Sequence, residues 1–199
     1  MSTLTGKAAP GFVTPAVMAD NSIRPDLSLD EYRGKYLVVF FYPEDFTYVC
    51  PSEILAFDAK LEEFRQRDCE VVGVSVDPEA THVDWKNTAV EDGGIGLVRY
   101  PLLADSTKEI SRAYGVLADE GVALRATFLI DREGVIRHSI INDLSLGRSI
   151  DDTLRTLDAL KHIDETGEVC PANWSRGKPA MEATPAGVKK YLREFKLGS

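Results

Sequence analysis

The sequence predicts an α/β fold in which helices flank a mixed central β-sheet. Residues 36–42 and 69–76 are continuously apolar, which is typical of strands covered on both faces. Segments with apolar residues at helical spacing lie between such runs. Residues 127–131 and 135–141 are two further apolar runs joined by a short turn, which indicates an antiparallel hairpin. Strands that alternate with helices and then close on a hairpin predict a mixed sheet.

The strand over residues 36–42 reads Tyr-Leu-Val-Val-Phe-Phe-Tyr and shows no polar alternation. Helices or other chain segments are therefore expected on both of its faces. The hairpin turn Asp131-Arg132-Glu133-Gly134 contains aspartate and glycine, which favour tight turns. The two hairpin strands are therefore expected to pair directly.

A helix is predicted over residues 51–67, directly after the first of these strands. Its apolar residues at helical spacing are Ile54, Phe57, Leu61 and Phe64. Pro51 suits the first helical position and Glu53 the third. Cys50 is then expected at the N-cap, where its sulfur would face backbone N–H groups that no carbonyl accepts.

A second long helix is predicted to open at Ser149, where Ser149-Ile150-Asp151-Asp152 forms a capping pattern. The apolar residues that it is expected to bury are Ile150, Leu154, Leu157 and Leu160. Shorter helices are predicted over residues 79–89 and 108–113.

The chain is expected to hold one domain, residues 1–166, followed by a C-terminal arm, residues 167–199. Its 199 residues with 44% hydrophobic content suffice for one substantial core. The arm is interrupted by prolines and glycines, so it is not expected to form a core element. A short amphipathic piece over residues 188–195 suggests that the arm docks on a protein surface.

Charge and hydropathy exclude several classes of partner. The 23 basic and 32 acidic residues give a net charge of -9, which repels nucleic acid and anionic lipid surfaces. No apolar run approaches the roughly 20 residues that span a bilayer. Residues 1–20 have one lysine, two prolines and no sustained apolar run, so neither a secretory signal nor a transit peptide is expected. The predicted location is the cytoplasm.

The chain has three cysteines, Cys50, Cys69 and Cys170, and no C-x-x-C pair. This number and spacing do not suit a disulfide scaffold. The three histidines are not clustered, so a zinc site has little support. Cys69 opens an apolar strand and is interpreted as structural.

Cys50 is a candidate for thiolate chemistry because it follows a buried strand and precedes a helix. A lone cysteine is more often a small buried hydrophobe than a nucleophile. The positive end of a helix favours ionisation of a thiol, but it contributes at most about 2 kcal/mol. A nearby cation would have to supply more. Arg125 and Arg148 are candidates, although either can equally be a solvated charge at a strand end or in a loop.

The segment around Cys50 resembles the active-site motif of the peroxiredoxins, which are thiol-dependent peroxidases with a thioredoxin-like fold. The matching pattern is Pro43-x-x-x-Thr47-x-x-Cys50 followed by Pro51 and Glu53. Val169-Cys170-Pro171 resembles the resolving-cysteine segment of the typical two-cysteine subfamily, which includes the alkyl hydroperoxide reductase C proteins. Further segments that resemble this family are 125–128, 142–144 and 147–149. The resemblance extends from about residue 8 to residue 195.

This resemblance implies a role for each residue of the motif. Cys50 is expected to be the peroxidatic nucleophile. Thr47 is expected to place its hydroxyl between thiolate and peroxide, because a hydroxyl both donates and accepts. Pro43 is expected to shield the sulfur from water, since its ring leaves no unsatisfied N–H.

The charged residues are expected to act on the thiolate and on the leaving oxygen. Arg125 and Arg148 would favour ionisation of the thiol and stabilise the charge that moves to the leaving oxygen. Glu53 would orient both guanidiniums by accepting their hydrogen bonds.

The implied reaction reduces hydrogen peroxide and organic hydroperoxides and leaves a sulfenic acid on Cys50. Cys170 of the partner subunit then condenses with it to form an intersubunit disulfide, which thioredoxin or a flavoprotein disulfide reductase recycles. The resemblance implies a homodimer and a decamer assembled from dimers, and no metal or organic cofactor. Local unfolding at both cysteines would let them meet.

The sequence leaves sensitivity to overoxidation open. Residues 93–96 read Gly-Gly-Ile-Gly, which resembles the glycine motif of oxidation-sensitive members, although a flexible surface loop explains it too. The companion tyrosine-phenylalanine motif reads Tyr191-Leu192 in this chain. The smaller side chain is expected to hold the folded active site less firmly.

Two other functions compete with the peroxidase hypothesis. A thioredoxin-type disulfide oxidoreductase would exchange protein disulfides, but the chain lacks the adjacent C-x-x-C pair. A ring-forming holdase chaperone or redox-relay protein would make peroxide reduction incidental. Insulin reduction tests the first, and client protection that survives Cys50→Ser tests the second.

Overall fold

The computed structural model describes residues 3–194. The chain forms two compact units, Met1–Ile150 and Asp151–Ser199. The long helix α5 (Ile150–Thr166) falls almost entirely in the second unit. The domain boundary predicted after residue 166 stays a prediction.

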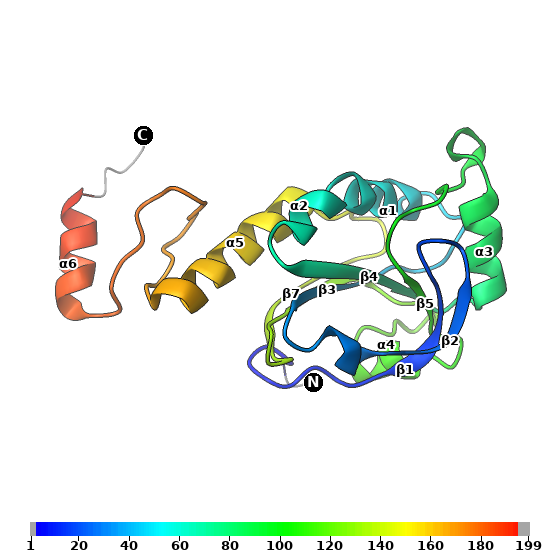
Figure 1. Cartoon of the computed structure of the whole chain (residues 1–199), viewed down its shortest axis with the longest axis horizontal. Helices are drawn as coiled ribbons and strands as arrows, with labels where there is room; N and C mark the ends of the chain where they lie inside the picture. Colours follow the sequence, from blue (N-terminus) through cyan, green and yellow to red (C-terminus); the bar gives the residue numbers. More distant parts are fainter. Residues whose placement is uncertain (1–2, 195–199) are drawn as a thin grey trace. The chain divides into compact units, whose positions relative to one another are not determined.

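The first unit is built on a seven-stranded mixed sheet, which confirms the predicted α/β architecture (Figure 1). The strands are β1 (Val13–Val17), β2 (Ile23–Ser28), β3 (Tyr36–Phe41), β4 (Cys69–Ser75), β5 (Leu102–Ala104), β6 (Arg125–Ile130) and β7 (Ile136–Asn142). Their order across the sheet is β2-β1-β5-β4-β3-β6-β7. β3, β4 and β5 pair in parallel, and the pairs on either side of them are antiparallel.

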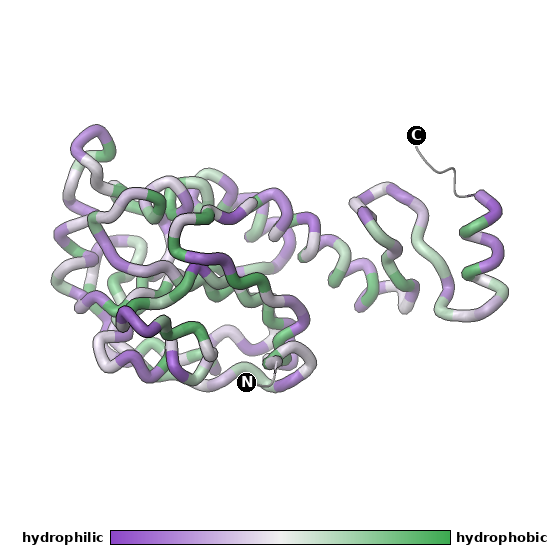
Figure 2. Tube along the Cα trace, turned by 180° about the vertical axis from the view of Figure 1, so that it is seen from behind, coloured by the Kyte–Doolittle hydropathy of each residue, from purple (hydrophilic) through white to green (hydrophobic). Residues whose placement is uncertain are grey.

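Helices cover the two faces of this sheet. They are α1 (Cys50–Ala59), α2 (Leu61–Arg65), α3 (Glu79–Asn87) and α4 (Glu109–Ala113). α1 and α2 lie over one face and α4 lies on the other (Figure 1). The tube in Figure 2 is hydrophobic along the central strands and hydrophilic along many outer loops.

Every residue of β3 is buried, as its continuously apolar sequence predicts. On one face Phe40 stacks on Phe57 of α1, with ring centroids 4.3 Å apart. On the other face Phe41 contacts the rings of Tyr114 and Phe128 at 5.1 and 5.8 Å. β3 therefore contacts an apolar layer on each face, and its C-terminal end leads into the loop that precedes Cys50 and α1.

The sequence did not predict β1, β2 and β5. β5 is only three residues long, and β1 and β2 each contain a proline. The register of β1 against β2 shifts between Thr14 and Ala16, on either side of Pro15. Proline is tolerated at such an irregularity because it has no N–H to donate to the ladder.

The helix predicted over residues 51–67 is two helices in the structure. α1 ends at Ala59, and Lys60, with φ -98° and ψ 2°, separates it from α2. The change of direction keeps both Ile54 and Phe64 fully buried. No proline or glycine marks this break, so local sequence did not reveal it.

The second unit contains α5 and α6 (Pro185–Glu194), joined by an irregular segment. A two-residue bridge pairs Val169 with Met181 and closes a loop between the helices. α6 corresponds to the amphipathic piece predicted over residues 188–195, of which Phe195 lies outside the described residues. Within residues 3–194, no helix has the length and apolar character that crossing a membrane requires.

Gly73 in β4 offers a test of how tightly the side chains of the neighbouring strands β3 and β5 pack over it. A Cβ at this position would lie 2.8 Å from a methyl carbon of Leu102 and 2.9 Å from the ring of Phe40. We expect Gly73→Ala to destabilise the protein by about 2 kcal/mol, because an overpacked core has to shift. Urea denaturation at one protein concentration measures the loss.

Gly11→Ala is the matched control for this substitution. A Cβ at Gly11 would meet no atom within 4 Å, so we expect its stability to stay within about 0.5 kcal/mol of the original chain. Equal stability of the two variants would contradict the tight packing at Gly73.

Candidate active site

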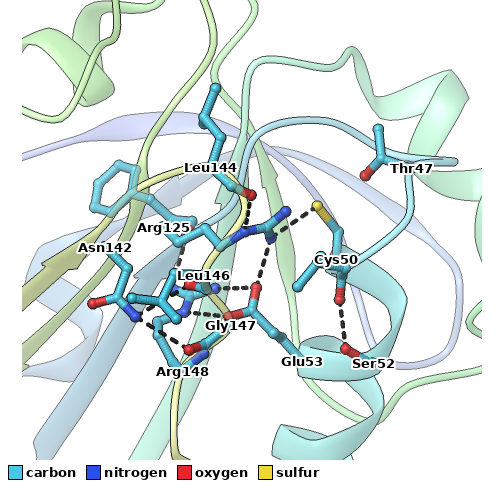
Figure 3. Close-up of polar contacts among 12 residues, drawn as sticks. Thr47, Cys50, Ser52, Glu53, Arg125, Asn142, Leu144, Leu146, Gly147 and Arg148 are labelled. Carbon is cyan, nitrogen blue, oxygen red and sulfur yellow. Dashed lines mark hydrogen bonds and ion pairs between the residues drawn. The ribbon is translucent and has the colours of Figure 1, made fainter.

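Cys50 is the first residue of α1, and Val49 is the N-cap residue. The prediction that Cys50 is the N-cap is therefore wrong by one position. Val49 already has helical φ and ψ, and its carbonyl accepts from the backbone N–H of Ser52 at 3.1 Å. The Cys50 side chain points away from its own helix turn and toward β6 (Figure 3).

The sulfur of Cys50 is in contact with the guanidinium of Arg125, the first residue of β6. Arg125 Nη1 donates to Cys50 Sγ at 3.2 Å (Figure 3). Cys50 is fully buried and Arg125 is 3% exposed. The contact is charge-assisted, and the low dielectric of a buried site strengthens the attraction between a guanidinium and a sulfur that carries negative charge.

Glu53 lies one turn along α1 and accepts hydrogen bonds from both arginines, as the resemblance implied. Its Oε2 accepts from Arg125 Nη1 at 2.8 Å and from Arg148 Nη2 at 2.9 Å. Its Oε1 accepts from Arg148 Nε at 2.8 Å and from the Arg148 backbone N–H at 2.9 Å. One buried carboxylate therefore fixes two guanidiniums.

The pKa of Glu53 is lowered below its ordinary value. Burial by itself raises the pKa of this carboxyl, but the hydrogen bonds and charge of Arg148, together with the charge of Arg125, outweigh burial. The site therefore holds two cations against one carboxylate, so a net positive charge faces the sulfur.

Arg148 donates hydrogen bonds to backbone carbonyls near the ends of β3 and β6, and none to the Cys50 sulfur. Its Nη1 donates to the carbonyls of Phe41 at 2.7 Å and Ala126 at 2.6 Å. Its guanidinium also lies over the ring of Phe40, 5.4 Å from the centroid. The hydrogen bonds recorded for Arg148 thus reach Cys50 only through Glu53.

The last residue of β7 and the loop after it hold Arg125 directly and fix the backbone that precedes Arg148. The carbonyl of Leu144 accepts from Arg125 Nε at 2.7 Å. Asn142 Nδ2 donates to the carbonyls of Leu146 and Gly147 at 3.1 and 3.2 Å (Figure 3). These contacts explain why the segment 142–148 belongs to the site although it is far from Cys50 in the sequence.

Pro43 and Thr47 lie in the loop between β3 and α1. Pro43 is buried. The Thr47 hydroxyl donates to the Glu44 carbonyl at 2.9 Å, which leaves its oxygen lone pairs available as acceptors. In the view of Figure 3 the Cys50 sulfur lies between Arg125 and Thr47.

A buried network anchors this loop, and the sequence did not reveal it. Asp45 Oδ2 lies 2.7 Å from His82 Nδ1 of α3, and Asp45 Oδ1 accepts from the Tyr42 hydroxyl at 2.9 Å. Burial raises the pKa of Asp45, and the bond and charge of His82 only partly offset this. The position of Asp45 inside the Cys50 motif was the one sequence feature that could have indicated a role for this residue. Nothing in the sequence linked Asp45 to His82.

The glycine motif over residues 93–96 follows α3 and is tied to it. The Trp85 indole donates to the Gly93 carbonyl at 2.9 Å. A Cβ at Gly94 would overlap the backbone of Thr88, so this position requires glycine. The motif is therefore a packed turn rather than a loose surface loop.

Cys170 lies in the second unit, on the segment after α5. Its thiol donates to the Ala159 carbonyl at 3.6 Å. Burial, and to a smaller degree the charge of Glu168, raise the pKa of Cys170. The predicted pairing of Cys170 with Cys50 stays a prediction, and all three cysteines carry free thiols.

Within residues 3–194, no group of three or more His, Cys, Asp or Glu side chains is placed to hold a metal ion.

Two family models match the chain. Residues 5–139 match the AhpC/TSA family, and residues 159–194 match the C-terminal domain of 1-Cys peroxiredoxin. The first match contains Cys50 and Arg125, and the second contains Cys170.

Named proteins match over nearly the whole chain. Alkyl hydroperoxide reductase C of Helicobacter pylori is 50% identical over 192 residues, which cover 96% of this chain and 97% of that protein. Peroxiredoxin-2 of Mus musculus is 50% identical over 188 residues, 94% of each chain. The reduced crystal structure of a Plasmodium vivax 2-Cys peroxiredoxin superposes with a TM-score of 0.95 at 47% identity, covering 96% of this chain and all of that one.

Glu53→Gln tests how far the site depends on this carboxylate. We expect the variant to be about 3 kcal/mol less stable at pH 7, because two buried guanidiniums lose their counter-charge. The pKa of Glu53 is lowered from 4.5 in the folded protein, so its stabilising effect is complete above pH 4.5 and is lost as the pH falls through the folded pKa. The difference between the two proteins should therefore shrink in acid.

Urea denaturation at pH 7 and at about pH 3.5 measures this difference. Glu63→Gln is the control, because Glu63 forms an exposed pair with Lys60 at 2.9 Å. We expect that control to change stability by at most about 1 kcal/mol. A Glu53→Gln protein as stable as the control would contradict the central role of Glu53.

Proposed function

Because the chain belongs to the AhpC/TSA family and is a thiol-dependent peroxidase of the typical two-cysteine peroxiredoxin type, we propose that Cys50 is its peroxide-reducing nucleophile. The observation that carries this proposal is the 3.2 Å contact between Arg125 Nη1 and Cys50 Sγ in a fully buried site. A thiolate held by a fixed cation is ready to attack before substrate arrives.

In the proposed first step the Cys50 thiolate attacks one oxygen of the peroxide and the O–O bond breaks. The attacked hydroxyl stays on sulfur as a sulfenic acid, and the other oxygen leaves as water or an alcohol after it takes up a proton. Arg125 stabilises the charge that moves from sulfur to the leaving oxygen. The Thr47 hydroxyl, whose proton goes to the Glu44 carbonyl, accepts a hydrogen bond from the peroxide. Pro43 limits access of water.

Glu53 and Arg148 are positioning residues in this proposal. Arg148 holds the ends of β3 and β6 together and fixes the Glu53 carboxylate. Glu53 in turn aims Arg125 at the sulfur. The reacting geometry therefore exists before peroxide binds, which is where most of the catalytic effect of such a site arises.

In the proposed second step the Cys170 thiolate attacks the Cys50 sulfenic sulfur. The S–S bond forms as the S–O bond breaks, and the oxygen leaves as water. Cys50 is fully buried, so the first turn of α1 has to open before another thiol reaches it. In these two steps the electrons come from the two cysteine sulfurs, so neither step requires a metal or an organic cofactor, and the external reductant then supplies two electrons to reduce the disulfide.

We propose that the Cys170 that reacts with Cys50 belongs to a second copy of the chain, so that the working unit is a homodimer. β7 supports this, because it is an edge strand with Ile140 37% and Ile141 48% exposed. An apolar edge strand is a ready surface for pairing with the same strand of a partner. Assembly of dimers into a decamer remains a prediction from the resemblance.

The proposed substrates are hydrogen peroxide and organic hydroperoxides, and the proposed reductant is thioredoxin or a flavoprotein disulfide reductase. One relative is named alkyl hydroperoxide reductase C, and a human relative, 50% identical, is named thioredoxin-dependent peroxide reductase. That human protein is mitochondrial and a barley relative is chloroplastic, so a cytoplasmic location for this chain stays a prediction.

The burial of Cys50 weighs against a general disulfide oxidoreductase. A protein disulfide is far bulkier than a peroxide and cannot reach a fully buried sulfur while the first turn of α1 stays closed. The holdase or redox-relay hypothesis has no specific structural observation in its favour.

Cys170→Ser tests the resolving cysteine. We expect the variant to reduce one equivalent of peroxide normally but to form no disulfide-linked dimer, because the sulfenic acid has no partner thiol. A rapid peroxide-consumption measurement followed by a non-reducing gel separates the two steps. Cys69→Ala is the control and should keep the dimer band, whereas a dimer band in Cys170→Ser would remove Cys170 from the cycle.

Thr47→Val tests the peroxide step. We expect the rate of the first peroxide reaction to fall by about 100-fold, since the methyl group neither donates nor accepts, while thermal stability changes little. Stopped-flow tryptophan fluorescence measures this rate. Thr47→Ser should restore most of it, and Thr88→Val, which loses a similar hydroxyl-to-carbonyl bond, should leave it unchanged. A normal rate in Thr47→Val would exclude the hydroxyl from the reaction.

A further inference from the structure

The segment that carries Cys170 is fastened to α5 by three side chains, His162, Glu168 and Trp174, which we call the His162 cluster. His162 Nε2 lies 3.0 Å from Glu168 Oε2. The His162 ring lies over Trp174, with centroids 4.9 Å apart and planes inclined by 35°. One imidazole thus contacts the chain both before and after Cys170.

Cys170 docks on the same helix next to this cluster. Its thiol donates to the carbonyl of Ala159, which precedes His162 by one turn of α5. Glu168 and Trp174 flank Cys170 in the sequence. Leaving α5 therefore requires this segment to break the contacts of His162 as well as its own.

Trp174 is a rigid platform for the imidazole. It is 4% exposed, and its indole N–H donates to the Lys178 carbonyl at 3.0 Å. Its own carbonyl accepts from Arg155 Nη1 at 3.2 Å. None of these contacts changes its protonation between pH 5 and 8, the interval in which histidine ordinarily gains or loses its charge.

The charge on His162 decides how strongly the cluster holds. The side chain is 26% exposed, so solvent protons reach it. A protonated imidazole makes an ion pair with Glu168 and a cation–π contact with Trp174, whereas a neutral one makes only a single hydrogen bond and a ring contact.

The other charged groups near His162 do not supply a contact whose strength changes between pH 5 and 8. On α5 the charged residues within two turns of His162 in the sequence are Arg155, Asp158, Lys161, Asp164 and Glu165. On the following segments they are Glu168 and Lys178, and the pocket that Glu168 lines also contains Glu182, Lys190 and Glu194. Lys161 pairs with Glu165 at 3.8 Å, and Arg155 pairs with Asp152 at 2.8 Å. None of these residue types ordinarily titrates between pH 5 and 8, and the pKa of the Cys170 thiol is raised above its ordinary value.

We propose that His162 is a positioning residue that fastens the Cys170 segment to α5 when it is protonated and loosens it when it is neutral. The proposal rests on Cys170 being the resolving thiol of the proposed function. Release of the segment has to precede the attack of the Cys170 thiolate on the Cys50 sulfenic sulfur. Disulfide formation is therefore slower in acid, and a sulfenic acid that waits longer is overoxidised more often by excess peroxide.

His162→Phe in the full-length protein is the direct test, since phenylalanine keeps the ring on Trp174 but carries no charge. Reduced protein is mixed with one equivalent of hydrogen peroxide between pH 5.5 and 8, quenched with an alkylating reagent and run on a non-reducing gel. We expect disulfide formation to be about fivefold faster in His162→Phe than in the original chain at pH 5.5. The ratio should be smaller at pH 8, where the variant loses only the hydrogen bond of a neutral imidazole.

The sign of this effect separates the proposal from a direct electrostatic effect on the thiol. Removing a cation near Cys170 disfavours its thiolate, so an effect through the thiol alone would slow the variant. A general loosening of the arm would speed it equally at every pH. Only loss of a contact that protonation strengthens speeds the reaction more in acid than in alkali.

Glu168→Gln and Glu165→Gln form the matched pair of second variants, each removing one carboxylate. Glu168 is the partner of His162, whereas Glu165 is paired with Lys161. We expect Glu168→Gln to flatten the pH dependence as His162→Phe does, and Glu165→Gln to leave it unchanged. Exchange of the Trp174 indole proton, followed by NMR in the reduced protein, should be about fivefold slower in the original chain than in His162→Phe at pH 5.5, and the ratio should be smaller at pH 8.

A ratio of rates that is constant with pH would overturn the role of His162 while leaving the proposed function intact. Failure of the original chain to form any Cys50–Cys170 disulfide would instead overturn the proposed function. In that case the exchange of the Trp174 indole proton would still measure how firmly the Cys170 segment is held on α5. An exchange-rate ratio between His162→Phe and the original chain that does not change with pH would overturn the role of His162 in holding it.

Discussion

The site depends on one carboxylate, that of Glu53, held between two buried guanidiniums. Arg125 comes from the start of β6 and Arg148 from the loop before α5, so Glu53 on α1 joins three parts of the first unit. Buried charges are costly unless they are paired and fully hydrogen-bonded, and here every oxygen of Glu53 accepts at least two bonds. Because the pair with Arg125 also sets the position of the cation on Cys50, the same contact serves folding and chemistry.

A site held this firmly has a cost for the catalytic cycle. Full burial of Cys50 favours the reaction with a small peroxide, but it keeps every other thiol away until α1 opens. Cys170 is also held, through the Ala159 carbonyl and the His162 cluster. In the proposed two-cysteine cycle the protein would therefore alternate between the closed state of this structure, which reacts with peroxide, and an open state in which the two thiols meet. Interactions that stabilise the closed state favour the first step and delay the second.

Local patterns predicted the elements with strong periodicity and missed those set by their neighbours. The apolar runs over residues 36–42 and 69–76 are β3 and β4, and the hairpin predicted after them is β6 and β7. β5 is too short to have a pattern of its own, and the proline strands β1 and β2 exist because adjacent strands pair with them. The break between α1 and α2 at Lys60 reflects how the two helices pack on the sheet. No proline or glycine at this position marks the break in the sequence.

The sequence by itself determined that Cys50 lies where a buried strand meets a helix, and its motif placed Thr47, Glu53 and Cys50 within one short segment. It did not determine what meets the sulfur. Arg125 is 75 positions away from Cys50, and Asp45 is 37 positions away from His82. Such contacts form only when β3 and β6 pair and α3 folds onto the loop. Their partners are chosen by the register of the sheet and by the need of buried charges to find counter-charges, which are properties of the tertiary structure rather than of any local pattern.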